Sequence, residues 1–151
     1  MRIAAVGTEA GGGGAGRPLN RAVTALAMRG HQVDILQAAR APLTPHSIVV
    51  TTNAEGPSDH AGHANLVRLQ AKYISDRRSS LSDTLFSHDL CGYDIAPLLA
   101  GYDVINVHWT SFFLSTENIG NIVALGRPVV FTLHDMAHFT GGCHYSAGCM
   151  N

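Results

Sequence analysis

The 151-residue chain has little charge, few cysteines and no long apolar run. Charged residues make up 14% of it and the formal net charge is −1, so a clustered basic surface is lacking and we expect no nucleic-acid partner. Three cysteines, an odd number, favour reduced thiols or a metal site over a disulfide framework. No stretch reaches the roughly 18 apolar residues of a membrane helix, and glycines interrupt the apolar N-terminus, so we expect a cytoplasmic protein without a signal peptide.

What the chain does contain is an alternation of strand and helix patterns, with 46% hydrophobic residues. Short β-rich runs predict five strands, the last two buried: Arg2–Gly7, Gln32–Gln37, Ser47–Thr52, Tyr102–Trp109 and Arg127–Asp135. One helix is expected to start at Pro18 and stop at Gly30, and another over Ser115–Gly126 with Ser115 as its cap. Residues 53–92 carry one helical pattern at 63–74 and a long loop. The alternation predicts an α/β fold with a parallel sheet flanked by helices.

The C-terminal stretch "TLHDMAHFTGGCHYSAGCMN" combines histidines, cysteines, an aspartate and glycines. We expect no helix or strand in the 18 residues that follow Leu133. A compact domain rarely ends on a cluster of reactive side chains directly after a strand. We therefore expect residues 1–151 to be one domain of a longer, truncated protein.

A glycine-rich loop follows the first strand and precedes the first helix. Gly11, Gly13 and Gly16 match the spacing of a dinucleotide-binding turn. However, three residues separate the strand from Gly11, and Gln37 stands near the place of the expected acidic residue. We expect the backbone of Gly11, Gly12, Gly13 and Gly14 to lie near a phosphate or another part of a substrate. The alternative is a flexible loop that only accommodates a turn.

Two histidines stand at the ends of predicted strands. His108 follows "DVINV" and is followed by Trp109, and His134 follows "PVVFTL" and is followed by Asp135. Ligands of open α/β sheets bind outside the carboxyl ends of the strands. Either histidine alone could equally be a hydrogen-bonded core residue, but the pair indicates a binding or catalytic site.

Cys143 and Cys149 are candidates for metal ligands, with His138 and His144 nearby. A structural zinc site requires four ligands, and the five-residue gap between the cysteines departs from the usual short spacing. We interpret them as an incomplete structural zinc site. Plain loop cysteines are the alternative, and a catalytic cysteine lacks any feature that would lower its thiol pKa.

Taken together, these segments resemble bacterial glycosyltransferases of family 4. The resemblance is carried by "TLHDMAHFTGGCHYSAGC", "GGGGAGR", "RSSLSDTLFS", "DVINVHWTSFFLS" and "RPVVFTLHDM", which together span nearly all of the chain. These enzymes have the GT-B fold, in which two Rossmann-like domains face each other across a cleft. The resemblance implies that residues 1–151 are the N-terminal, acceptor-side Rossmann-like domain and that the C-terminal donor-binding domain is absent.

The resemblance also implies a reaction and a set of site residues. It implies retaining transfer of a hexose from a nucleotide-sugar to a glycan or lipid-linked acceptor hydroxyl, in cell-surface polysaccharide or glycan synthesis, with peripheral association at the inner membrane surface. Gly11–Gly14 would lie beside the donor diphosphate. His134 and Asp135 would be the catalytic residues, with His134 facing the donor sugar, and His108 and Trp109 would bind substrate in the same cleft. Cys143 and Cys149 would be half of a structural cluster, and the isolated domain would be inactive.

Two other classes remain open at the level of sequence. A nicotinamide-dependent oxidoreductase would use the glycine loop, but it is disfavoured by the missing acidic residue. A non-enzymatic metal- or sugar-binding α/β module would need no second domain.

Overall fold

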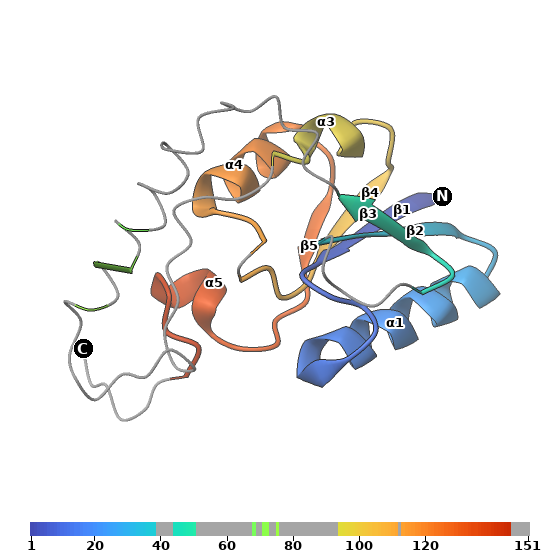
Figure 1. The fold of residues 1–151 in the computed structure, drawn as a ribbon. Helices are drawn as coiled ribbons and strands as arrows, with labels where there is room; N and C mark the ends of the chain where they lie inside the picture. The colour runs from blue at the N-terminus through green and yellow to red at the C-terminus, as the bar shows by residue number, and fades with distance from the viewer. Residues whose placement is uncertain are drawn as a thin grey trace.

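A computed structural model describes residues 1–38, 44–50, 68, 71, 72, 75, 94–111 and 113–145. All of the predicted loop at 79–94 except Asp94, most of the helical pattern at 63–74, and Cys91 and Cys149 lie outside these residues. Within them, the predicted α/β fold is confirmed: five parallel strands form one sheet flanked by helices (Figure 1). The strands are β1 Arg2–Gly7, β2 Gln32–Ala38, β3 Ser47–Val50, β4 Val104–Val107 and β5 Val129–Phe131.

The strands lie in the order β3-β2-β1-β4-β5. The chain therefore fills one half of the sheet outward from β1, then crosses back and fills the other half from β4. The order reverses between β1 and β4, so the loops after these two strands leave toward opposite faces. Such a reversal point opens a crevice at the carboxyl ends of the strands, where ligands of α/β proteins bind.

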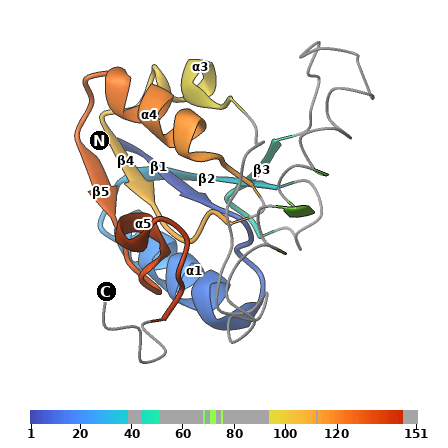
Figure 2. The same ribbon diagram turned by 90° about the vertical axis from the view of Figure 1, so that its left-hand side faces the viewer.

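Helices cover the two faces of the sheet (Figure 2). Helix α1, Gly13–Met28, lies on one face, and α3, Ala96–Leu99, and α4, Thr116–Ala124, lie on the other. Successive strand residues point to opposite faces, and the core is divided in the same way. Leu19 and Val23 of α1 pack with the cluster Ile3, Ala5, Val33 and Ile35. The second cluster contains Ala4, Val6, Leu36, Leu99, Ile105, Val107, Phe113 and Ile122.

Helix α1 begins at Gly13, five residues before the predicted start, so the expectation that Pro18 opens the helix is wrong. The early start depends on glycine: Gly13 has φ +66°, and a Cβ at Gly16 would lie 3.1 Å from the Glu9 carbonyl oxygen. The predicted end is confirmed. Gly30 has φ +82° and its N–H donates to the Ala27 carbonyl at 2.9 Å, as in a glycine-terminated helix.

Helix α4 begins with the predicted serine cap. Ser115 Oγ accepts from the Asn118 backbone N–H at 3.2 Å, and Asn118 Oδ1 accepts from the Ser115 N–H at 3.0 Å. These two reciprocal hydrogen bonds form a capping box, in which Asn118 takes the place that an acidic side chain usually has. Because both residues are buried, water cannot easily replace either hydrogen bond.

Replacing Ser115 with alanine is expected to lower the free energy of unfolding by about 1 kcal/mol, the usual effect of losing a helix cap. Urea unfolding followed by circular dichroism measures the change. Thr24→Ala removes the same hydroxyl from the exposed interior of α1, where it only donates to the Asn20 carbonyl. We expect that control to change stability by less than ~0.5 kcal/mol. Equal effects of the two variants would contradict the assigned cap.

Strand β5 differs from the expectation of a buried strand. The side chains of Val130, Phe131 and Leu133 are 51%, 38% and 53% exposed. The physical reason is its position at the edge of the described sheet, where only β4 pairs with it. A continuous apolar run reads the same for a central strand and for an apolar edge, so periodicity alone could not separate them.

The segment after β5 also departs from expectation, because it contains a short helix. Helix α5, Ala137–Thr140, is a single turn that ends at Gly141, which has φ +75°. None of the described helices is both long enough and apolar enough to cross a membrane.

Candidate functional site

The carboxyl ends of β1 and β4 meet at the reversal point of the sheet. The N–H of Thr8 donates to the Trp109 carbonyl at 2.8 Å, and Thr8 Oγ1 donates to the Ser111 carbonyl at 2.7 Å. A Cβ at Gly7 would lie 3.5 Å from the Cβ of His108 and 2.7 Å from Leu19 Cδ1. A side chain at position 7 would therefore require the buried Leu19 to move. One residue, Thr8, ties the loop that leads to the glycines to the loop that follows His108.

The glycines predicted to approach a ligand lie at the start of α1. Added Cβ atoms at Gly12 and Gly14 would meet nothing within 4 Å, so the backbone at these positions is accessible. At Gly13 an added Cβ would collide with the Glu9 carboxylate. A carboxylate beside a helix N-terminus is electrostatically favourable. Glu9 therefore places a negative charge where the sequence predicts a phosphate, a feature that the glycine pattern did not reveal.

Gln37 is the second last residue of β2. Its side chain is fully buried, and its Oε1 accepts from the Ala10 N–H at 3.1 Å. Dinucleotide-binding sheets use an acidic side chain near this place to bind the ribose. Here the amide is turned inward to hold the start of the glycine loop. The geometry therefore disfavours the oxidoreductase alternative.

His108 and His134 form a direct pair. His108 Nδ1 lies 2.9 Å from His134 Nε2, and His108 Nε2 lies 3.0 Å from Asn106 Nδ2. The two rings are 5.2 Å apart between centroids. His108 is 1% exposed and both of its ring nitrogens are engaged, whereas His134 is half-buried. We interpret His108 as a support for His134 rather than a direct contact of a ligand.

Burial keeps both imidazoles neutral. Desolvation, followed by the neighbouring His134, lowers the pKa of His108 from 6.5 to about 4. Desolvation also lowers the pKa of His134, with His138 acting in the same direction and the Asp135 carboxylate opposing it. A neutral imidazole has one donor and one acceptor nitrogen, so His134 can hydrogen-bond a polar ligand without carrying a charge.

Asp135 is engaged within its own segment. Its Oδ1 accepts from the Ala137 N–H at 2.9 Å, and its Oδ2 lies 2.5 Å from His144 Nδ1. The Met136 N–H donates to the His144 carbonyl at 3.0 Å, which closes the loop between them. His144 is 5% exposed. We interpret Asp135 as the residue that orders the segment from 135 to 144, although the sequence suggested a catalytic role.

The predicted cysteine site is only partly within the described residues. Cys143 is half-buried and forms no disulfide there, and Cys149 lies outside them. Among the residues that the structure describes, no three His, Cys, Asp or Glu side chains are grouped as metal ligands. The structural zinc site therefore stays a prediction.

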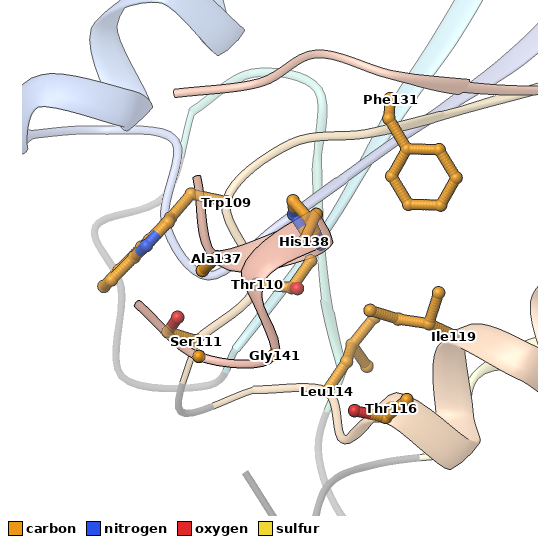
Figure 3. A pocket seen from close by; sticks show the side chains of 11 residues that line it. Trp109, Thr110, Ser111, Leu114, Thr116, Ile119, Phe131, Ala137, His138 and Gly141 are labelled. Carbon is orange, nitrogen blue, oxygen red and sulfur yellow. The ribbon is translucent and has the colours of Figure 1, made fainter. Parts of the chain in front are cut away.

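A pocket of about 210 Å³ begins at Trp109, the residue that follows His108 (Figure 3). It lies between the loop after β4, the start of α4, and α5. Its lining combines aromatic and aliphatic side chains with hydroxyls and one imidazole: Trp109, Thr110, Ser111, Leu114, Thr116, Ile119, Phe131, Ala137, His138, Gly141 and Gly142. His138 joins the pocket to the pair, because its Nε2–H donates to the His108 carbonyl at 3.0 Å.

Several of the predicted site residues come together at one edge of the sheet. His108 and His134 touch, Trp109 lines the pocket, and the glycine loop starts from the strand end that contacts His108. Sequence reasoning missed Thr110, Ser111 and Phe131, which also line the pocket. The hydroxyl pair directly after the strand-end "HW" was the available signal, since polar groups just past a strand point into such crevices.

Comparisons with known proteins add no identification. No family model, no curated protein and no solved structure matches the chain. A functional assignment therefore depends on the site geometry and on the sequence resemblance.

Proposed function

We propose that this chain is the acceptor-side domain of a glycosyltransferase that resembles family 4, with a GT-B architecture. It would move a hexose from a nucleotide-sugar to an acceptor hydroxyl in cell-surface polysaccharide or glycan synthesis. The observation that supports this best is the joining of three features at the reversal point of the sheet. These are an accessible glycine backbone at a helix start, a neutral histidine pair, and an amphipathic pocket beside them.

Each feature matches one demand of glycosyl transfer. The departing diphosphate gains negative charge, and the backbone N–H groups of Gly12–Gly14 at the start of α1 are suited to stabilise it. The sugar gains positive charge, and the neutral His134 can bind its hydroxyls without adding repulsion. The acceptor would occupy the pocket, whose lining includes Trp109, Thr110 and Ser111.

A second domain would supply the rest of the donor site. The buried Gln37 leaves the end of β2 without an acidic group for a ribose, so the nucleoside must be held elsewhere. We expect the 151-residue chain alone to transfer no sugar. A lipid-linked acceptor would bring the enzyme to the inner face of the cytoplasmic membrane as a peripheral protein.

The proposal is tested by titrating the ¹⁵N-labelled chain with nucleotide-sugars and with oligosaccharide acceptors. Donors are expected to shift the amide signals of Gly12 and Gly14, and acceptors those of Thr110 and Gly141. The amides of β3, at the far edge of the sheet, serve as the internal reference. Equal shifts in β3 and in the pocket, or none at millimolar ligand across the panel, would contradict the proposal.

Glu9 provides a second test of the diphosphate position. Removing its charge with Glu9→Gln is expected to tighten the binding of pyrophosphate about 2- to 5-fold, because one charge near a helix terminus contributes about 0.3–1 kcal/mol. Isothermal titration calorimetry measures the affinity. Glu117→Gln, which removes a charge from the first turn of α4, is the matched control. Weaker binding by the Glu9 variant would place the diphosphate away from Gly13.

A further inference from the structure

Two polar side chains stand beside the histidine pair on neighbouring strands. Asn106 belongs to β4, and Thr132 directly follows β5. Thr132 Oγ1 donates to Asn106 Oδ1 at 2.9 Å, and the amide nitrogen of Asn106 lies 3.0 Å from His108 Nε2. With the 2.9 Å contact between the rings, a continuous chain of hydrogen bonds runs from Thr132 through Asn106 and His108 to His134.

The orientation of the Asn106 amide sets the donors and acceptors along this series of hydrogen bonds. An amide –NH₂ group has only protons to offer, so the His108 Nε2 that faces it must present a lone pair. The proton of the neutral His108 is then on Nδ1, from which it is donated to His134 Nε2. His134 therefore accepts at Nε2 and carries its own proton on Nδ1.

We propose that Asn106 is a positioning residue that sets the tautomers of both histidines and so makes His134 present an N–H donor to the site. Thr132 supports this role, because its hydroxyl proton holds the amide oxygen and keeps the –NH₂ group toward His108. The proposed donor to a ligand is the N–H at His134 Nδ1. Asn106 acts through the two histidines and does not itself contact a ligand.

This order has a chemical consequence for the proposed reaction, and this part rests on the proposed function. A His134 that carries its proton on Nδ1 cannot accept a proton there, so it does not act as a general base toward the acceptor hydroxyl. Instead it donates a hydrogen bond to an oxygen lone pair of the sugar. The site therefore selects a ligand by an accepting oxygen at this point.

The tautomers can be measured directly in the whole chain, independently of any enzymatic activity. In ¹⁵N-histidine NMR spectra at neutral pH, protonated and unprotonated ring nitrogens have well-separated chemical shifts. We expect Nδ1 to be protonated and Nε2 unprotonated in both His108 and His134. A protonated Nε2 on His134 in the unmodified chain would overturn the proposal without any variant.

A near-isosteric substitution should reverse the direction of these hydrogen bonds. In Asn106→Asp the carboxylate can only accept, so His108 must protonate Nε2 to donate to it, and His134 must then donate from Nε2 to His108 Nδ1. On both rings we expect the proton to be on the other nitrogen, so that Nε2 has the chemical shift of a protonated nitrogen and Nδ1 that of an unprotonated one. Asn118→Asp, which makes the same change in the cap of α4, should leave them as they are. Unchanged tautomers in a folded Asn106→Asp variant would also overturn the proposal.

The outcome for Asn106 and the outcome for sugar transfer can be told apart. Reversed tautomers together with an absence of sugar binding would support the positioning role and contradict the transferase. Sugar binding with unchanged tautomers would do the opposite.

Discussion

The free energy of unfolding of this chain is expected to fall by on the order of 3 kcal/mol, through His108 alone, as the pH is lowered from 6.5 to 4. The pKa of His108 is lowered from 6.5 to about 4, and each pKa unit corresponds to about 1.4 kcal/mol. The ring is 1% exposed, so solvent does not screen this difference. Denaturant unfolding at a series of pH values measures the effect.

The direction of the effect follows from proton uptake. Between pH 6.5 and 4 the unfolded chain binds a proton at His108 and the folded chain does not, so stability rises with pH across this window. The contribution is complete above pH 6.5 and is lost as the pH falls toward 4. His134, whose pKa is also lowered, acts in the same direction, and the measurement must therefore be made as a difference between variants.

His108→Gln isolates the contribution of one ring. This variant is expected to be less stable at pH 7 but to lose less stability between pH 6.5 and 4 than the unmodified chain. His31→Gln changes a histidine just before β2 and far from the pair. We expect this variant to lose as much free energy of unfolding between pH 6.5 and 4 as the unmodified chain does. If His108→Gln and the unmodified chain have parallel pH profiles, His108 is not held neutral by its surroundings.

If the proposed function holds, replacing His134 with alanine is expected to lower turnover of the proposed two-domain glycosyltransferase about 100-fold, as for the loss of one positioned hydrogen-bond donor. At 298 K this corresponds to ~2.7 kcal/mol of transition-state stabilisation. The effect should fall on turnover more than on the Michaelis constant, because the contact strengthens as charge develops on the sugar. Steady-state kinetics with purified donor and acceptor measure it.

Two conservative variants separate the ring nitrogens of His134. The amide of asparagine can replace Nδ1, while the longer glutamine can replace Nε2, which contacts His108. If Nδ1 binds the sugar, His134→Asn should keep more activity than His134→Gln. Turnover that stays unchanged in His134→Ala would remove this residue from the mechanism.

The sequence predicted the sheet well because its signals were local. The β-rich runs located the five strands of the described residues. Gly30 marked the end of α1 with the positive φ that such an end requires, and Ser115 marked the start of α4. The prediction from Pro18 was wrong because this proline lies inside α1, five residues after Gly13, whereas proline is usual at the first helical position. The exposure of β5 depends on which strands are neighbours, a property that no local pattern contains.

The location of the candidate site could be predicted from the sequence, but the hydrogen bonds among its side chains could not. Strand-end positions placed His108 and His134 at one edge, as parallel topology requires. That His108 is buried and bonded to His134, and that Asn106 and Thr132 complete the chain, depends on side-chain contacts between residues up to 26 positions apart. The same holds for Asp135, whose partner His144 lies nine residues further on.

The two hydrogen bonds of Thr8 have a kinetic consequence. They fasten the loop on the glycine side to the loop on the pocket side, so a ligand that binds either loop has less conformational freedom to remove. For the proposed glycosyltransferase, we therefore expect neither substrate to be needed for the binding of the other to this domain, so that donor and acceptor bind in random order.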